Sequence, residues 1–176
     1  MTTPVAGRTP APSDGGQALE LLELAAYSIL VARQCFPDAA FTKVRRCKHF
    51  AWVPRMEDVQ SYVTTGLSTA AKAGGCHFLL STRTASGVSE EFLLVLGPVD
   101  QTVQPITPED AAAKFLIELE CRLALLPAPE GGGTDWVLAS DVSGGAEWSA
   151  STLAIGEGRR LAGAAVGGTG VQVFLM

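Results

Sequence analysis

The longest apolar pattern in the chain runs from Gln17 to about Cys35 and has the spacing of an α-helix. Its apolar residues recur three and four positions apart, and a second set widens the stripe: Leu19, Leu22, Ala26, Ile29 and Leu30, then Leu21, Leu24 and Val31. A helix that is apolar around so much of its circumference is expected at the centre of a fold. Asp14 is a candidate N-cap, and Pro37 predicts the end of the helix because proline excludes its preceding residue from helical geometry.

Two further helices are predicted from periodicity and from their end signals. The span from Met56 to Lys72 carries apolar residues on one side and stops at the Ala-Gly-Gly of 73–75. The third helix begins with Thr107 as N-cap and Pro108 at its first position, and Pro127 ends it. Both helices are amphipathic, so each is expected to cover a core on one face.

Strands are predicted after the second helix and near the C-terminal residues. His77–Thr82 and Glu91–Leu96 are β-prone runs joined by a polar, Gly-containing loop, which predicts a β-hairpin. Asp135–Ser140 and Val171–Met176 are two further β-prone runs. Residues 41–53 hold two short runs in which we expect irregular or weakly extended structure.

Glycine and proline mark the segments that lack such patterns. Residues 1–16 are rich in Pro, Gly, Thr and Ala and are interpreted as a flexible arm. Gly144–Gly170 is rich in Gly, Ala and Ser, and because glycine loses much entropy on ordering we expect it to be the most mobile part of the fold. An ordinary long loop is the alternative. The chain is therefore predicted to hold one domain over residues 17–176, with a core at 17–140 and a tail at 141–176.

Composition and charge narrow the function classes. Apolar residues make up 47% of the chain and charged residues 18%, which is typical of a folded domain. A formal net charge of −5 argues against sequence-independent binding to duplex DNA, which needs a dense basic field. The local basic cluster of Lys43, Arg45, Arg46 and Lys48 is either a solvated face or a contact for an acidic partner. No apolar run reaches the roughly 18 residues of a membrane span, so no membrane contact is expected.

The residues that usually carry chemistry form no motif in this sequence. The four cysteines include no C-x-x-C pair, so neither a disulfide framework nor a zinc site is expected, and reduced thiols of the cytosol or nucleus are the default. His49 and His77 have no metal ligand at helical or turn spacing, and no P-loop, G-x-G-x-x-G or G-x-S-x-G is present. We predict no metal, no cofactor and no enzyme activity. A small enzyme that uses a Cys or His site, for example Cys47 with His49, is the alternative.

The order of the predicted elements carries a family resemblance. A long apolar helix that ends in SILVARQCFP is followed by the short basic segment AFTKVRRC and by a second helix that carries Tyr62. This order resembles the opening of HORMA domains, and the resemblance extends over almost the whole chain from Gln17. It implies an α+β fold in which three helices pack on an antiparallel sheet and a mobile C-terminal segment, the seat belt, follows the core.

The resemblance implies a non-catalytic adaptor that traps a peptide motif of a partner beneath the seat belt. Within the family, MEDVQSYV, SEEFLLVL and VQVFL are most similar to the accessory subunit of translesion DNA polymerase zeta. That branch implies a peptide of the polymerase catalytic subunit as partner, a role in DNA repair, and a location in the nucleus, with the cytoplasm as a second one. FTKVRRC and the run DWVLASD resemble instead the spindle-checkpoint branch, in which two tail conformers control mitotic progression.

The same resemblance marks candidate site residues. Tyr62 matches the second-helix aromatic that touches the partner peptide, Gln172 and Phe174 match closing-strand positions near the peptide path, and Trp148 corresponds to the seat-belt aromatic. Arg33, at the end of the first helix, is a candidate adaptor or dimer surface for a second HORMA chain. Core roles for Tyr62 and Phe174, and a helix-dipole role for an exposed Arg33, are the alternatives. No direct sequence-specific contact with nucleic acid is expected.

Overall fold

The computed structural model describes residues 14–98, 107–142, 158–166 and 168–176. These residues form three α-helices and seven strands, together with a short 3-10 helix at Asp38–Ala40. In chain order the elements are α1 (Asp14–Ala32), β1 (Phe41–Arg46), β2 (His49–Pro54), α2 (Glu57–Lys72), β3 (His77–Thr84), β4 (Ser89–Pro98), α3 (Pro108–Ala124), β5 (Gly133–Ser140), β6 (Arg159–Val166) and β7 (Thr169–Leu175).

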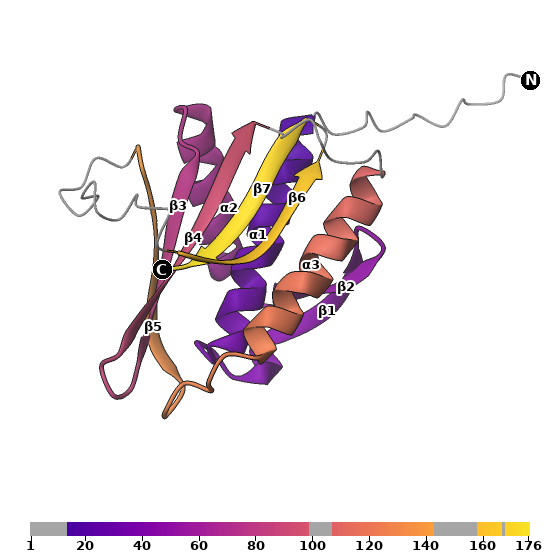
Figure 1. Ribbon diagram of the computed structural model, residues 1–176. Coiled ribbons are helices and arrows are strands. Elements are labelled where there is room, and N and C mark those ends of the chain that lie inside the picture. Colours follow the sequence, from indigo (N-terminus) through magenta and orange to yellow (C-terminus); the bar gives the residue numbers. More distant parts are fainter. Residues whose placement is uncertain (1–13, 99–106, 143–157, 167) are drawn as a thin grey trace, which may run out of the picture.

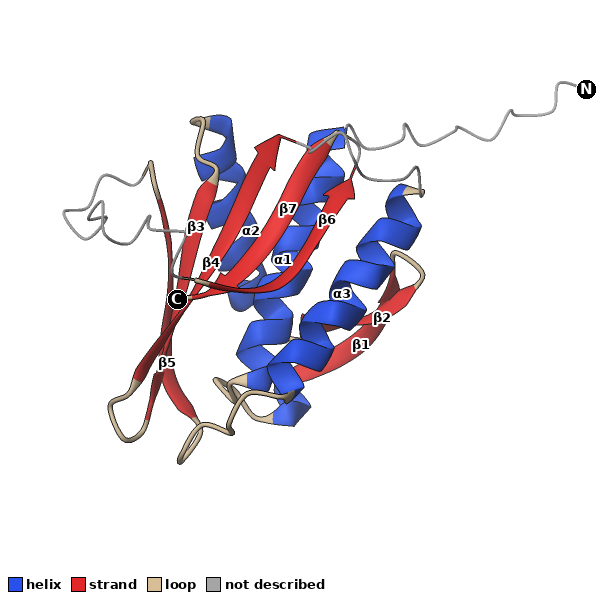
Figure 2. Cartoon of the chain, viewed as in Figure 1, coloured by secondary structure: helices blue, strands red, loops and turns tan. Residues whose placement is uncertain are grey.

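Five of the strands form one antiparallel sheet in the order β5-β3-β4-β7-β6, and β1 and β2 form a separate hairpin (Figure 1). The helices cover one face of the five-stranded sheet (Figure 2): α2 meets β5, α1 meets β7, and α3 lies along β6. The predicted α+β class, with three helices packed on an antiparallel sheet, is confirmed. None of the described helices is long and apolar enough to cross a membrane.

The core forms around α1, which is enclosed by the sheet and the other two helices. Leu22, Ile29 and Leu30 are each 0% exposed, as their helical spacing predicted. Tyr27 is also buried, and its hydroxyl donates a 2.6 Å hydrogen bond to Glu23. Burial, together with that hydrogen bond, raises the pKa of Tyr27 above its ordinary value. Thr64 of α2 donates to the same carboxylate at 2.9 Å, so one acidic side chain ties the two helices together.

Both ends of α1 differ from the prediction. The helix is described from Asp14 to Ala32, so Asp14 lies within the helix and is not its cap. Gln34 has a φ of 53°, and the N–H groups of Gln34 and Cys35 donate to the carbonyls of Val31 and Leu30, each at 3.0 Å. These two bonds form a Schellman motif. The left-handed conformation of Gln34 thus ends the helix, and Pro37 lies beyond this end.

The β1–β2 hairpin replaces the irregular or weakly extended structure expected for residues 41–53. Its two-residue turn is formed by Cys47 and Lys48, whose φ values are 49° and 59°. Positive φ at both central residues is the type I′ geometry that matches the twist of the strands. The usual sequence signal for this turn is Asn-Gly or Asp-Gly. A Cys-Lys pair carries no such signal, so the hairpin was missed.

The basic cluster that lies on this hairpin meets partners within the chain. The Nζ atom of Lys43 lies 4.7 Å from the ring centre of Trp52, and Lys48 forms a 3.0 Å ion pair with Asp110 at the start of α3. Arg46 lies 3.7 Å from Glu20. This arrangement favours the solvated, internally paired interpretation of the cluster over a dedicated acidic-partner surface.

The C-terminal part of the expected loose segment is a strand. β6 spans Arg159–Val166 and pairs with β7, and Leu161, Ala162 and Val166 are buried at 0–1% exposure. We expected Gly144–Gly170 to be the most mobile part of the fold and assigned no strand to it, so β6 was missed. Small residues concealed the strand because they give a weak alternating signal. They fit here because α3 packs closely along β6. Residues 143–157 lie outside the described ranges.

Candidate functional site

The two outer strands of the sheet differ in how they are covered. β6 has α3 packed along it, whereas β5 pairs only with β3 among the described residues (Figure 1). The side of an outer strand that has no further strand beside it can take up another extended chain. β5 is therefore the edge of this sheet at which another extended chain can pair.

A groove of about 430 Å³ lies between α2 and this edge. Its lining is mainly small or apolar, with Gly66, Thr69 and Ala70 from α2 and Phe78, Leu138 and Val142 from the sheet side. Leu138 is paired with Leu80 of the buried core, so its side chain lies on the helix face of the sheet. Side chains of an added strand that point to this face would enter the groove.

An aromatic cluster lies on the same two elements, α2 and β5, next to the groove residue Leu138. Tyr62 is 48% exposed, and its ring lies 5.3 Å from that of Trp136 in an edge-to-face arrangement. Trp136 in turn lies 6.2 Å from Phe36. The hydroxyl of Tyr62 donates to the carbonyl of Leu138 at 3.4 Å. The structure therefore places Tyr62 beside the β5 edge, with its ring partly open to solvent and not in the core.

Gln172 and Phe174 lie elsewhere. Both are on β7, which has β4 on one side and β6 on the other, so that strand has no unpaired edge. Because Val173 belongs to the helix-side core, its two neighbours point to the opposite face of the sheet. β3 and β4 separate them from β5, so the structure does not bring them together with Tyr62. Trp148 is outside the described residues.

Arg33 is a buried residue, not the exposed one that a docking surface requires. Its side chain is 3% exposed and makes a two-pronged contact with Glu90, Nε to Oε2 at 2.6 Å and Nη2 to Oε1 at 2.9 Å. Nη2 also donates to the carbonyl of Pro127 at 3.0 Å. Arg33 thus fastens the end of α1 to β4 and to the chain that follows α3.

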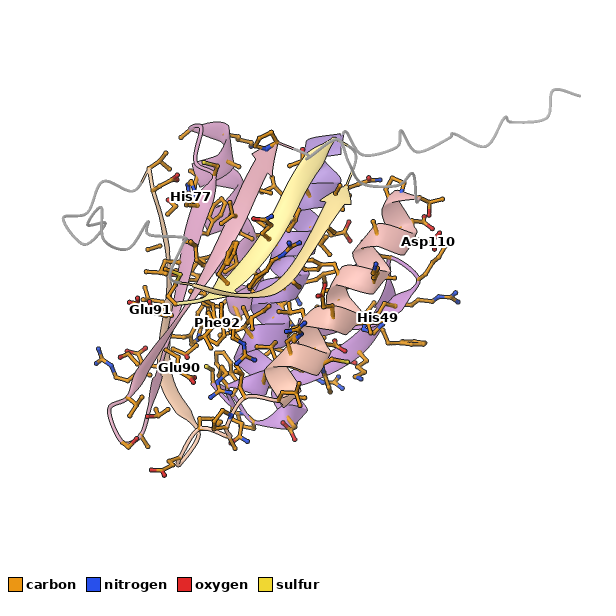
Figure 3. All side chains as sticks on the ribbon, viewed as in Figure 1. His49, His77, Glu90, Glu91, Phe92 and Asp110 are labelled. Carbon is orange, nitrogen blue, oxygen red and sulfur yellow. The ribbon has the colours of Figure 1, made fainter. Side chains whose placement is uncertain are left out.

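Cys76, His77 and Asp141 form a cluster that the sequence analysis missed. His77 Nδ1 lies 3.2 Å from Cys76 Sγ and 3.0 Å from Asp141 Oδ2, and the sulfur lies 3.6 Å from the same oxygen. His77 begins β3, as Figure 3 shows, and Asp141 directly follows β5. The adjacent Cys76 and His77 were visible in the sequence, but Asp141 joins them only through the pairing of β3 with β5.

The electrostatics of this cluster favour the thiol of Cys76 over its thiolate. Burial raises the pKa of Cys76, and the charge of Asp141 adds to the increase. Burial alone would raise the pKa of Asp141, but hydrogen bonds from His77 and Cys76 outweigh it and hold that pKa below its usual value. Both partners approach Nδ1 of His77, whereas a nucleophilic triad uses one ring nitrogen for each partner. The arrangement does not have the geometry of a cysteine protease-like site.

The alternative dyad of Cys47 with His49 also lacks support. The Nε2 atom of His49 lies 3.2 Å from a carboxylate oxygen of Glu120 in α3. Burial raises the pKa of Cys47, and Glu20 adds to this effect. A raised pKa leaves less thiolate, which is the nucleophilic form. His49 and His77 lie at separate places in the molecule (Figure 3).

This chain is similar to known proteins in its structure. No family model matches the sequence, and no curated protein matches it. A chain from a crystal structure of the mitotic checkpoint complex superposes with a TM-score of 0.70 at 18% identity, covering 92% of this chain and 97% of that one. The chain has a HORMA-like fold.

Other structures with this HORMA-like fold hold a bound motif. HTP-2 of C. elegans, bound to the HIM-3 closure motif, gives a TM-score of 0.63 at 9% identity over 92% of this chain and 90% of that one. HTP-2 bound to HTP-3 motif-6 gives 0.60 at 8% identity over 90% and 87%. At such identities the similarity concerns the fold, and it does not distinguish the polymerase branch from the checkpoint branch.

Proposed function

We propose that this chain is a non-catalytic adaptor that captures an extended peptide of a partner protein by strand addition to β5. The observation that carries the proposal is the outer edge of β5, which has no further strand beside it within the described residues and lies next to a groove of about 430 Å³. Backbone hydrogen bonds to the edge would supply affinity, and the groove would select every second side chain of the peptide. Its lining favours an apolar side chain.

The connection between β5 and β6 supports capture by a seat belt. These strands are consecutive in the described fold yet occupy opposite edges of the sheet. The segment that joins them starts at the edge to which the peptide would add. If that segment wraps the peptide, release requires local unfolding, which slows dissociation without a large interface. HTP-2, which has the same fold, is bound to a motif in its structures, and this supports peptide capture as the function.

Two substitutions at one position test the groove. A Cβ at Gly66 would lie 3.6 Å from Leu138 Cδ2, which is ordinary contact, so Gly66→Ala leaves the groove largely open. Because Gly66 lies within α2, this change is expected to stabilise the protein by about 0.5–1 kcal/mol. Gly66→Leu would fill the groove and is expected to weaken peptide binding by about tenfold or more, the loss of roughly 1.4 kcal/mol.

The measurement is titration of labelled peptides tiled from a polymerase zeta catalytic subunit and from checkpoint partner proteins, with amide hydrogen exchange on the full chain. A bound peptide should add protection to Gly133–Ser140. Binding that leaves the exchange of this strand unchanged contradicts strand addition. Equal affinities of the Gly66→Ala and Gly66→Leu proteins contradict the groove as the recognition element.

For the cellular role we propose the accessory subunit of DNA polymerase zeta, in translesion synthesis and DNA repair, with a nuclear location. The similarity of MEDVQSYV, SEEFLLVL and VQVFL to that branch supports this role. Its partner would be a peptide of the polymerase catalytic subunit. Pairing with a second HORMA chain, identical or different, stays a prediction whose surface is not Arg33 in the described conformation.

A spindle-checkpoint role is the second candidate. The resemblance of the segment FTKVRRC to that branch supports it. The fold shared with a chain of the mitotic checkpoint complex is compatible with this role but does not select it. This role requires two conformers of the tail that exchange slowly. Two separable monomer species on ion-exchange chromatography would support it, whereas one species under all conditions, together with binding of a polymerase peptide, supports the repair role.

A further inference from the structure

The cluster of Cys76, His77 and Asp141 has the donor set and spacing of a metal site. It is the one group of three such side chains within the described residues whose ligand atoms all lie within 4.8 Å of one another. Thiolate, imidazole and carboxylate are the three ligand types that Zn²⁺ accepts in proteins. Asp141 and His77 have side chains that are 24% and 23% exposed, so the cluster is partly shielded from water and still reachable by an ion.

The distances between the three donor atoms match a tetrahedral zinc site. Zinc holds sulfur at about 2.3 Å, imidazole nitrogen at about 2.0–2.1 Å and carboxylate oxygen at about 2.0–2.2 Å, so tetrahedral angles place pairs of ligand atoms about 3.3–3.6 Å apart. The corresponding distances here are 3.2 Å for sulfur to nitrogen, 3.0 Å for nitrogen to oxygen and 3.6 Å for sulfur to oxygen. Movements of a few tenths of an ångström would suffice.

The backbone around the cluster holds these side chains in place. α2 ends in a Schellman motif: Gly74, with a φ of 87°, donates to Ala71 at 3.0 Å, and Gly75 donates to Ala70 at 2.8 Å. This end of α2 leads directly into Cys76, whose carbonyl accepts from Leu96 at 2.8 Å. A site set on fixed backbone needs little reorganisation to bind an ion.

The carboxylate of Asp141 is also fixed by hydrogen bonds to the backbone. Its Oδ2 accepts the N–H groups of Cys76 and His77, each at 3.3 Å, and its own N–H donates to the His77 carbonyl at 3.1 Å. Its Oδ1 is buried and has no hydrogen-bond partner. A Cβ on Gly75 would lie 2.9 Å from Oδ1, so only glycine leaves room for this carboxylate. An orphaned buried carboxylate oxygen is costly, and a nearby divalent cation would offset that cost.

We propose that Cys76, His77 and Asp141 bind a Zn²⁺ ion that clamps the start of β3 to the end of β5. Binding converts the Cys76 thiol to a thiolate and releases one proton to solvent. The neutral His77 ring binds through Nδ1, and Asp141 binds through Oδ2. The fourth position of the tetrahedron is left for water or for a ligand from another molecule. This inference does not depend on peptide capture.

Titration of the reduced full chain with Co²⁺, followed by competition with Zn²⁺, tests the site. Tetrahedral cobalt bound to a thiolate gives a charge-transfer band in the near ultraviolet, and we expect that band to saturate at one ion per chain. Cys76→Ser should abolish this band. His77→Gln and Asp141→Asn should each weaken metal binding by more than about 100-fold, because loss of a residue that only supports a ligand weakens it by about 10- to 100-fold. Saturating Zn²⁺ should raise the thermal midpoint of the unmodified protein but not of Cys76→Ser.

Two control variants test whether the ion binds at this cluster and not at another cysteine or histidine. Cys121→Ser removes an exposed thiol, and His49→Gln removes the other histidine that faces an acidic side chain, Glu120 at 3.2 Å. Both should bind Co²⁺ like the unmodified protein. Absence of a thiolate band, or a band that survives Cys76→Ser, overturns the proposal and leaves the cluster as a hydrogen-bonded group. Folding of each variant is checked by its thermal transition in metal-free buffer.

Discussion

Single residues decide the local geometry of this fold, and several do so in ways that their type does not suggest. Gln34, Cys47 and Lys48 adopt positive φ, which glycine or asparagine normally supplies. Gly75 is required because Ala70 and Asp141 approach it closely, not because of its backbone angles. Tyr62 was matched to a peptide-contacting position by resemblance, and the structure places it next to the edge strand. The sequence could not place Arg33, because its partner Glu90 lies on a distant strand.

The cysteines are expected to differ in reactivity at the residue scale. Burial raises the pKa of Cys35 to about 11 from 9.0, whereas Cys121 is exposed. Because the thiolate is the nucleophile, a maleimide at about pH 8 should label Cys121 quickly and Cys35 slowly. Mass spectrometry of digests taken over time measures both rates, and equal rates would contradict the burial of Cys35.

The same residue gives a pH dependence of stability. The folded state holds the Cys35 proton more tightly than the unfolded chain does, so its contribution is present below the unfolded pKa of 9.0. That contribution is lost as the pH rises from 9.0 towards about 11. Cys35→Ala should therefore show a flatter loss of stability in alkaline denaturant titrations than the unmodified protein. Parallel pH curves for the two proteins would argue against this assignment.

At the scale of elements, the sequence predicted those with strong signals. The Thr107 cap accepts the N–H of Asp110 at 3.2 Å and Pro108 opens α3, both as expected. The β3–β4 hairpin formed, although its strands run on to Thr84 and from Ser89, inside the predicted loop. The β1–β2 hairpin was missed because a Cys-Lys pair is not a usual signal for its turn. The strand β6 was missed because its glycine and alanine residues give only a weak alternation of apolar and polar positions.

The ion pair between α1 and β4 gives a prediction at this scale. Glu90 shares the helix face with buried Phe92, while its neighbour Glu91 faces the other side (Figure 3). Glu90→Ala leaves the buried guanidinium of Arg33 without its carboxylate and should lower the free energy of unfolding by about 3 kcal/mol. Glu91→Ala is the matched control, with an expected change within about 0.5 kcal/mol. Urea denaturation measures the free energy of unfolding of both variants. A similar decrease for the two would contradict a specific contribution of the buried ion pair to stability.

At the scale of the whole molecule, the order of strands in the sheet was not accessible from the sequence. β7 follows β6 in the chain but lies between β6 and β4, and β5 lies at the far edge. Local patterns fix which segments are strands, but long-range pairing fixes their order, and no local signal reports it. The candidate edge, the groove and the Cys76 cluster all follow from that order. Of the candidate residues that the structure describes, only Tyr62 lies beside this edge, and its contact with a peptide stays a prediction.

Removal of Leu161–Met176 is expected to unfold the domain. β6 and β7 bury Leu161, Val171 and Val173 in the core and supply the neighbour of β4. Circular dichroism should show that the cooperative thermal transition is lost. A truncated protein that keeps the transition of the full chain would mean that β6 and β7 are peripheral. Peptide-release experiments therefore need point substitutions at the β5 edge and not this truncation.

The pairing of β4 with β7 also sets an order of events during synthesis. Pro98 pairs with Thr169 and Phe92 with Leu175, so β4 is translated long before its neighbour. Until the ribosome has released those late residues, Leu94 and Val95 lie on an unfilled edge of a half-built sheet. A nascent chain in that state is a client for chaperones that bind apolar strands. The yield of folded protein in cells should therefore depend on keeping β4 from pairing with other chains until β7 has been synthesised.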